Sequence, residues 1–334
     1  MSEMAAELSA EELPVLSVVV PMYNEATGVL ALYERLHAVL EATGERWEMI
    51  CVNDGSRDET LEVLTALHQR DARVRVIDLA RNFGKEVALS AGLDHASGDA
   101  VIPIDADLQD PPELIPELLR CWKEGAEVVN ATRRSREGES WFKKTTANVF
   151  YHILEKMTHI AIPRNTGDFR LISRPALQAL QRMPERSRFM KGMFPWVGFR
   201  QATVLFDREP RHSGTTKWNY WRLWNLALEG ITSFSSVPLR VWSYLGLGVA
   251  LFAFLYMMFL MVRTLIFGID VPGYASLMVV VLFIGGIQLI GLGVLGEYLA
   301  RIFEEVKARP LYVVRERLGF SQEMIDHAKT LPGR

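Results

Sequence analysis

Two long stretches without a charged residue most strongly limit what this chain can fold into. They run from Trp242 to Val262 and from Tyr274 to Gly296. Both exceed about 18 apolar residues, the length that indicates a membrane-spanning helix. The alternative is a pair of buried core helices, but soluble core helices rarely run this long without a charge. The sequence therefore predicts a transmembrane helical hairpin, assigned to residues 241–300, behind a soluble N-terminal part.

The positions of the basic residues predict how the hairpin is oriented. The connection from Arg263 to Gly273 is short and carries one Arg and one Asp. Basic residues flank both outer ends, at Lys217, Arg222, Arg240, Arg301, Lys307, Arg309, Arg315 and Arg317. Because loops rich in Lys and Arg stay on the cytoplasmic side, we expect the soluble domain and both termini to be cytoplasmic, with residues 301–334 as a C-terminal tail.

Overall charge, the N-terminus and the cysteines exclude several classes of protein. A net charge of −3 over 334 residues argues against general nucleic-acid binding. Residues 1–14 are acidic and lack an apolar core, so they are expected to be a flexible N-terminus and not a signal peptide. Cys51 and Cys121 are far apart in apolar contexts, which predicts no disulfide framework and suits a reducing compartment.

Residues 15–216 alternate apolar strands with helical segments. The predicted strands are Leu16–Pro21, Glu48–Val52, Val74–Leu79, Ala100–Ile104 and Glu127–Ala131. The predicted helices are Ala26–Leu40, one that starts at a capping box of Ser56 and Glu59, Lys85–His95, and one opened by Asp110 and the prolines that follow it. This alternation predicts an α/β domain with a mainly parallel, Rossmann-like sheet covered by helices on both faces.

Polar residues gather where the predicted strands end, which is where such sheets bind ligands. The clusters are Tyr23-Asn24-Glu25, Asp54, Arg81-Asn82 and Asp105/Asp107. Asp105 and Asp107 are two residues apart, so an extended segment places both carboxylates on one side. A divalent metal with diphosphate oxygens would suit this pair. A solvated strand end or a helix cap is the alternative for the pair alone.

The region before the hairpin is less regular. Asp207–Lys217 is a basic loop that contains glycine, and Trp218–Val237 shows an amphipathic pattern rich in Trp and Leu. We expect amphipathic helices in residues 217–240 to lie in the membrane interface, with an ordinary core helix as the alternative. A G-x-G-x-x-G match at Gly291 lies inside the second apolar stretch, so it predicts helix packing and not a dinucleotide site.

Several motifs, in order, resemble glycosyltransferase family 2 with the GT-A fold. They are Pro21-Met22-Tyr23-Asn24-Glu25, Asn53-Asp54-Gly55-Ser56, Arg81-Asn82-Phe83-Gly84-Lys85-Glu86, the DADLQDPPEL run from Asp105, Asn165-Thr166-Gly167-Asp168-Phe169-Arg170, and the Arg211–Lys217 loop. With the two apolar stretches, the set is most similar to the polyisoprenyl-phosphate glycosyltransferases. That group includes dolichol-phosphate mannose synthase and the bacterial bactoprenol glucosyltransferases. The resemblance covers about Leu16 to Val314.

The resemblance implies roles for individual residues. It implies nucleotide-sugar contacts for the first motif and the strand ends, at Pro21, Tyr23, Asn24, Glu25, Asp54, Lys85, Asp105 and Ala106. It implies an Mg²⁺ or Mn²⁺ ion held by Asp105, Asp107 and Gln109, and a catalytic base at Asp168. Phosphate or acceptor contacts are expected at Arg133, Arg170, Arg211 and Lys217. Asn53 departs from the pattern, because many relatives carry a second Asp there, and we expect a local change in nucleotide contacts.

The implied reaction is inverting transfer of a hexose, with UDP-glucose as the favoured donor, to undecaprenyl phosphate at the bacterial inner membrane. Donor and acceptor are both anionic, so concentrated positive charge is required. A phosphate monoester has a second pKa of about 6 and is largely ionised at neutral pH. It therefore needs little help from a general base, so Asp168 is alternatively an orienting or charge-shielding residue.

Other functions remain as alternatives. The donor sugar is open among UDP-glucose, galactose, N-acetylhexosamine, aminoarabinose and GDP-mannose. A processive polysaccharide synthase is disfavoured because no Q-x-x-R-W motif is found. A lipid-transport component would need more spans or intramembrane charges, and intact Asp105, Asp107 and Asp168 argue against an inactive sugar-nucleotide binder. Gly285, Gly286 and Gln288 in the second span suggest a homo-oligomer.

Overall fold

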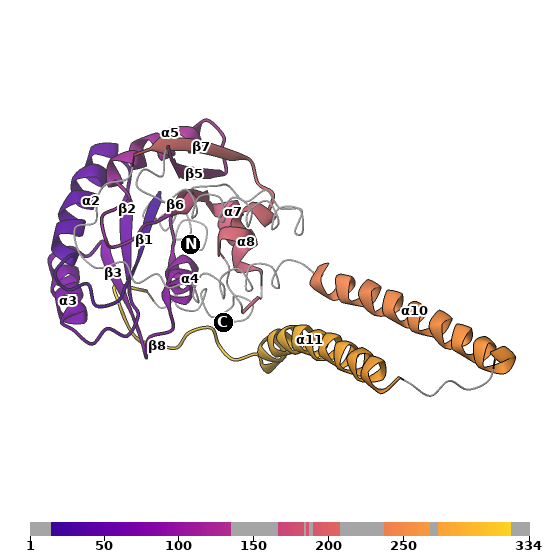
Figure 1. Cartoon of the computed structure of the whole chain (residues 1–334). Coiled ribbons are helices and arrows are strands. Elements are labelled where there is room, and N and C mark those ends of the chain that lie inside the picture. The colour runs from indigo at the N-terminus through magenta and orange to yellow at the C-terminus, as the bar shows by residue number, and fades with distance from the viewer. Residues whose placement is uncertain are drawn as a thin grey trace, which may run out of the picture.

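The computed structural model describes most of the chain. It covers residues 15–134, 166–183, 185–186, 190–207, 237–267 and 273–321. In the soluble part, one mixed sheet is sandwiched between two layers of helices, and a pair of long helices extends away from it (Figure 1). The predicted α/β class and the predicted paired apolar helices are both confirmed.

The sheet has eight strands in the order β7-β5-β6-β4-β1-β2-β3-β8. Their bounds are β1 Leu16–Met22, β2 Trp47–Asn53, β3 Val74–Leu79, β4 Ala100–Pro103, β5 Val128–Arg133, β6 Thr166–Ser173, β7 Gln201–Phe206 and β8 Val314–Leu318. The pairs β1–β2, β1–β4, β2–β3 and β5–β7 are parallel, whereas β4–β6, β5–β6 and β3–β8 are antiparallel. The central strands are buried on both faces, as their continuous apolar sequences require.

Helices cover both faces of this sheet. On one face, α2 (Val29–Thr43), α3 (Thr60–Arg70) and α5 (Ile115–Lys123) share a buried apolar cluster with the strands. On the other face, α4 (Lys85–His95), α7 (Arg174–Gln181) and α8 (Met190–Trp196) share a second cluster. A one-turn 3-10 helix, η1 (Pro112–Leu114), precedes α5. Gly92 of α4 packs so tightly on β1 that a Cβ there would come within 2.3 Å of a Val19 methyl.

One local prediction about this domain was wrong. Ser56 does not cap α3, which begins at Thr60; its hydroxyl instead accepts a hydrogen bond from the backbone N–H of Asn24 at 3.0 Å. Asp58 takes the position near the helix start and accepts from the backbone N–H of Thr60 at 3.2 Å.

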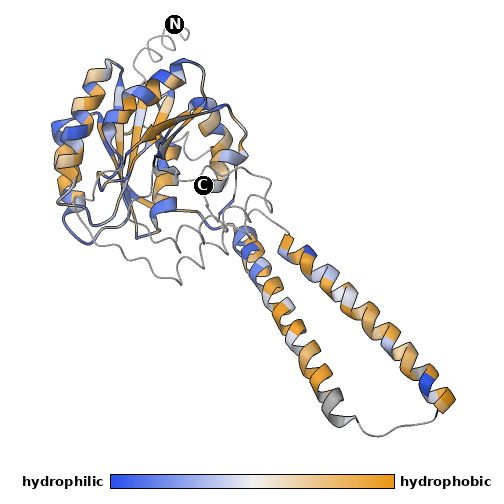
Figure 2. Ribbon diagram, turned by 45° about the horizontal axis from the view of Figure 1, so that its top comes forward, coloured by the Kyte–Doolittle hydropathy of each residue, from blue (hydrophilic) through white to orange (hydrophobic). Residues whose placement is uncertain are grey.

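The two apolar stretches form helices α10 (Val237–Phe267) and α11 (Tyr274–Lys307). Much of the ribbon of both helices has the hydrophobic colour in Figure 2, and large apolar side chains such as Phe252, Phe259 and Leu289 are mostly exposed. Segments Val237–Phe267 and Val279–Lys307 are long and apolar enough to cross a membrane. Helices with such exposed surfaces fit association with a lipid bilayer.

The chain returns from the hairpin to the sheet of the soluble domain. After α11, residues Val314–Leu318 add strand β8 to the edge of the sheet beside β3. The carboxylate of Glu305, near the end of α11, also accepts a hydrogen bond from the backbone N–H of Arg186 at 2.7 Å. Part of the segment expected to be a tail therefore belongs to the soluble domain, which lies at both outer ends of the hairpin.

Candidate active site

The loops after β1 and β2 interlock at the carboxyl edge of the sheet. Asn24 accepts a hydrogen bond from the backbone N–H of Arg57 at 2.8 Å, and Glu25 donates its backbone N–H to Thr60 Oγ1 at 3.0 Å. Asn24 has a φ of 57°, a left-handed conformation that asparagine tolerates better than most residues. The predicted first motif is thus fixed by the second, with Tyr23 partly exposed beside it.

Asp54 holds the next loop in place. Its two carboxylate oxygens accept hydrogen bonds from the backbone N–H groups of Phe83 at 2.7 Å and Gly84 at 2.9 Å. Burial raises the pKa of Asp54, and these two hydrogen bonds oppose that shift. Gly55 adopts a φ of +62° against the Arg81 backbone, where a Cβ would come within 2.4 Å of the carbonyl carbon. Asp54, expected at the nucleotide base, therefore shapes this edge through backbone contacts.

Lys85 joins two acids that lie far apart in the sequence. Its Nζ lies 2.8 Å from Asp105 Oδ2 and 2.6 Å from Asp168 Oδ2, and it comes from the first residue of α4. Burial disfavours the charged ammonium, but the two carboxylates outweigh this effect and hold the pKa of Lys85 above its usual range. Three of the predicted site residues therefore meet. The ammonium of Lys85 connects Asp105 with Asp168, the predicted catalytic residue.

Asp107 and Gln109 form the part of the site best suited to a metal ion. Asp107 Oδ1 accepts the backbone N–H of Gln109 at 3.2 Å, and Leu108 between them has a φ of 56°. The side-chain Oε1 of Gln109 is buried and has no hydrogen-bond partner among the described residues. A buried amide oxygen without a partner, on a residue whose backbone contacts a carboxylate, is a type of ligand that suits a hard cation such as Mg²⁺ or Mn²⁺.

The protein ligands for such an ion would be few. The described residues contain no group of three His, Cys, Asp or Glu side chains placed to hold a metal. Asp105, the third predicted ligand, is engaged by Lys85 through both carboxylate oxygens. Phosphate oxygens of a bound nucleotide would complete the coordination, as is usual for Mg²⁺ sites.

Arg133 lies close to Gly167, the residue before Asp168. It pairs with the buried carboxylate of Asp110 at 3.8 Å, and a Cβ on Gly167 would meet Arg133 Nη2 at 3.6 Å. This position is compatible with the phosphate or acceptor contact expected of Arg133. Asp110 was read from the sequence only as a helix cap, although it belongs to the same acidic run as Asp105 and Asp107.

Arg170 lies beneath the site and not on its surface. It is 3% exposed, its Nη2 donates to the carbonyl oxygen of Gly167 at 2.7 Å, and its guanidinium stacks 3.9 Å from the centre of the Phe194 ring. Burial lowers its pKa to about 10, against the opposing charges of Asp168 and Glu86. This burial argues against the predicted phosphate contact; Arg170 instead supports the backbone that carries Asp168.

The remaining predicted residues divide between this edge and the undescribed parts of the chain. A Cβ on Gly28 would lie 3.9 Å from the carbonyl oxygen of Ala106, which brings the β1 loop against the acidic run. Pro21 is the second-to-last residue of β1 and is partly buried. Arg211, Lys217 and most of the interfacial segment expected at residues 217–240, namely residues 217–236, lie outside the described residues.

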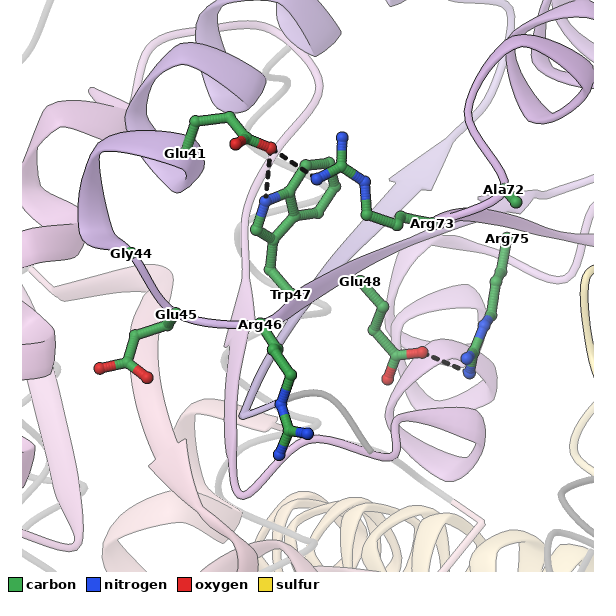
Figure 3. Close-up of a pocket in the computed structure, with 9 residues that line it drawn as sticks. All are labelled: Glu41, Gly44, Glu45, Arg46, Trp47, Glu48, Ala72, Arg73 and Arg75. Carbon is green, nitrogen blue, oxygen red and sulfur yellow. Dashed lines mark hydrogen bonds and ion pairs between the residues drawn. The ribbon is translucent and has the colours of Figure 1, made fainter. Parts of the chain in front are cut away.

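A cavity of about 490 Å³ lies at the opposite edge of the sheet, at the amino ends of β2 and β3. Figure 3 shows its lining side chains, which include Trp47, Arg73 and Arg75. Arg73 stacks 4.0 Å above the Trp47 ring and pairs with Glu41. The cavity contains none of the predicted site residues, and parallel α/β sheets bind ligands at the other edge.

Comparison with known proteins shows which family the chain belongs to. The model of "Glycosyl transferase family 2" matches residues 17–181, and that of "GtrB C-terminal hairpin" matches residues 237–302. The chain is 49% identical to the SfII prophage-derived bactoprenol glucosyl transferase of Shigella flexneri, over 90% of this chain and 97% of that protein. This chain belongs to glycosyltransferase family 2. A Synechocystis protein described as an uncharacterized glycosyltransferase is 59% identical over 91% of this chain and 96% of its own length.

The family 2 assignment confirms the resemblance seen in the motifs and identifies the protein as a membrane-associated transferase. Among solved structures, glucosyl-3-phosphoglycerate synthase from Mycobacterium tuberculosis in complex with Mg²⁺ and UDP superposes with a TM-score of 0.49. The two proteins are 20% identical over 69% of this chain and 80% of that chain.

Proposed function

We propose that this glycosyltransferase transfers glucose from UDP-glucose to a polyisoprenyl phosphate, with inversion at the anomeric carbon. The observation that carries the proposal is the meeting of Lys85, Asp105 and Asp168 at the carboxyl edge of the sheet, in a chain whose hairpin leaves from the same domain. The lipid acceptor and the sugar are supported by the relatives that are named bactoprenol glucosyl transferase.

Asp107 and Gln109, with Asp105 after exchange of its Lys85 contact, are the residues that would hold Mg²⁺ or Mn²⁺. The ion would neutralise charge on the departing diphosphate. The β1 loop approaches the acidic run where Gly28 faces the carbonyl oxygen of Ala106, and Lys85 contacts Asp105. We expect the nucleotide to lie between them, with its sugar directed toward Asp168.

The transfer forms a bond between a phosphate oxygen of the lipid and the anomeric carbon, and breaks the bond from that carbon to the diphosphate. Because the acceptor monoester is already largely ionised at neutral pH, no proton has to be removed as it attacks. Lys85 provides positive charge at Asp168, and Arg133 provides it near Gly167, the preceding residue. We expect Arg211 and Lys217 to hold the acceptor phosphate.

The architecture suits a substrate that cannot leave the bilayer. A polyisoprenyl chain stays in the membrane while its phosphate lies at the surface, so the catalytic domain has to be held there. The soluble domain precedes α10 in the sequence, and β8, which follows α11, pairs with β3 of the same domain. The domain is therefore connected to both outer ends of the hairpin. Together with the flanking basic residues, this arrangement supports a cytoplasmic catalytic domain and cytoplasmic termini at the bacterial inner membrane.

The direct test is sugar transfer by the purified full-length protein in detergent or vesicles. We expect radiolabelled glucose from UDP-glucose to enter undecaprenyl phosphate when Mg²⁺ or Mn²⁺ is present. UDP-galactose, UDP-N-acetylglucosamine, a UDP-aminoarabinose derivative and GDP-mannose serve as competing donors. Preferred transfer from one of these would revise the sugar, and no lipid-linked product from any donor would overturn the proposal.

The role of Asp168 can be separated from that of a general base by the pH profile. We expect Asp168→Asn to lower kcat by about 100-fold, because it loses the charge that holds Lys85. The rise of the wild-type rate through about pH 6 should persist in the variant, because it reports the second ionisation of the acceptor. If the rise disappears in Asp168→Asn, then Asp168 is the titrating base and the positioning role is wrong.

A further inference from the structure

Strand β8, which follows the hairpin, contacts the carboxyl end of β3 through the side chain of Arg315. Arg315 of β8 donates from Nη1 to Asp78 Oδ2 at 3.3 Å and from Nη2 to the carbonyl oxygen of Ala80 at 2.8 Å. Asp78 lies near the end of β3 and is only 2% exposed. A charge-assisted contact to a buried carboxylate fixes both partners more firmly than a contact between surface groups does.

The Asp78 carboxylate also begins a series of hydrogen bonds that leads to the predicted nucleotide site. Asp78 Oδ1 accepts from Asn53 Nδ2 at 2.7 Å, and Asn53 Oδ1 accepts from the backbone N–H of Ser56 at 3.3 Å. Ser56 Oγ in turn accepts the backbone N–H of Asn24 at 3.0 Å. This series of hydrogen bonds therefore connects Arg315 with the β1 loop, where Tyr23, Asn24 and Glu25 are expected to contact the nucleotide.

This series of hydrogen bonds also explains why residue 53 is an asparagine. Asp78 already occupies the buried space at 2.7 Å from the Asn53 side chain and needs a donor there. An aspartate at position 53 would place a second buried carboxylate against it, which is unfavourable without a proton or a cation. The departure from the family pattern thus serves the contact with Asp78, whereas we expected it to alter nucleotide contacts directly.

The β1 and β2 loops need this support because their backbones are constrained. Asn24 and Gly55 both have positive φ angles, and Gly55 is wedged against the Arg81 backbone. Their positions depend on the Asn24–Ser56 and Ser56–Asn53 contacts. A small shift of Asn53 would therefore be passed to the β1 loop and change the shape of the nucleotide site.

Strand β8 is held in place by contacts other than that of Arg315. It pairs with β3 along the backbone, Tyr312 Oη donates to Asp94 Oδ2 at 2.9 Å, and Arg317 Nε lies 3.1 Å from His95 Nε2. The rings of His95 and Phe320 also pack edge to face. Removal of the Arg315 side chain alone should leave the strand docked.

We propose that Arg315 is a positioning residue for the nucleotide donor, acting through Asp78, Asn53 and Ser56. The returning strand thus completes the uridine nucleotide side of the site without contacting the nucleotide. The inference rests on the proposed function for the identity of the donor class, but it does not depend on the acceptor.

The test uses the full-length protein in detergent and measures UDP binding in the presence of Mg²⁺ by calorimetry, with donor and acceptor KM as kinetic readouts. We expect Arg315→Met to weaken UDP binding and raise the donor KM by roughly three- to tenfold, with kcat and the acceptor KM unchanged. Arg315→Lys keeps the charge near Asp78 and should recover part of the loss. Glu316→Gln, on the neighbouring exposed residue of the same strand, is the matched control and should bind UDP as the wild type does.

Several outcomes overturn the inference. Unchanged UDP affinity in both Arg315 variants would do so, as would an equal loss in Glu316→Gln. A fall in kcat and thermal stability without a change in donor KM would assign Arg315 a structural role alone. If Arg315→Met does not fold, the same comparison is decided by Arg315→Lys. A wild-type protein that binds UDP but transfers no sugar to undecaprenyl phosphate would overturn the proposed function and leave this inference standing.

Discussion

Asp107→Ala is expected to reduce sugar transfer by roughly 100- to 1,000-fold, the scale seen when a group that stabilises developing charge is removed. Asp107 lies at the carboxyl edge of the sheet and accepts the backbone N–H of Gln109, whose side-chain Oε1 is buried without a partner among the described residues. Without its carboxylate, charge on the departing diphosphate would be poorly neutralised. Steady-state transfer with UDP-glucose and undecaprenyl phosphate measures the effect.

Metal binding gives a second readout that does not depend on activity. We expect Asp107→Ala to weaken Mn²⁺ binding in the presence of UDP, as followed by electron paramagnetic resonance. Asp99→Ala is the matched control, because Asp99 is exposed at the opposite end of the same strand, just before β4. Equal product formation and equal Mn²⁺ affinity in Asp107→Ala and the wild type would remove the metal assignment.

Lys85→Met should also impair transfer severely, by about 100-fold in kcat/KM. The substitution keeps most of the side-chain volume but removes the ammonium that lies 2.8 Å from Asp105 and 2.6 Å from Asp168. The two carboxylates would then repel each other and the anionic donor. A restored rate on addition of high Mg²⁺ would show that a second cation can substitute for the ammonium.

The control for this prediction is Lys123→Met. Lys123 Nζ also contacts a carboxylate, that of Glu45 at 2.5 Å, but the pair is exposed at the far side of the domain. Exposed pairs of this kind contribute little to stability, so transfer should remain at the wild-type level. If Lys85→Met behaves in the same way, Lys85 is a surface residue without a role in the site.

Local sequence signals predicted most of the central elements because those elements are buried and regular. Strand β3 and helix α4 have the predicted bounds, since each has a clear apolar pattern and polar ends. Strand β8 was missed because its sequence, VRERL, is mostly charged, as suits the edge of a sheet. Its partner β3 lies more than 200 residues earlier, so no local pattern indicates the pairing.

The candidate site was predictable in composition but not in its connections. Asp105 and Asp107 could be placed on one side of a strand end from their spacing alone. The contact of Lys85 with Asp168 spans 83 residues and depends on β6 lying beside β4. The burial of Arg170 under Phe194 likewise depends on the packing of α8, which sequence periodicity does not reveal.

The position of β8 determines when the protein can finish folding during its synthesis. Residues 314–318 are translated after both apolar helices, so the sheet acquires its last strand only after the segments destined for the bilayer have been made. Until then β3 has an open edge, a site at which nascent chains can pair wrongly. The sheet is therefore completed only after both apolar helices have been translated, and a chain interrupted before residue 314 would have an uncapped sheet.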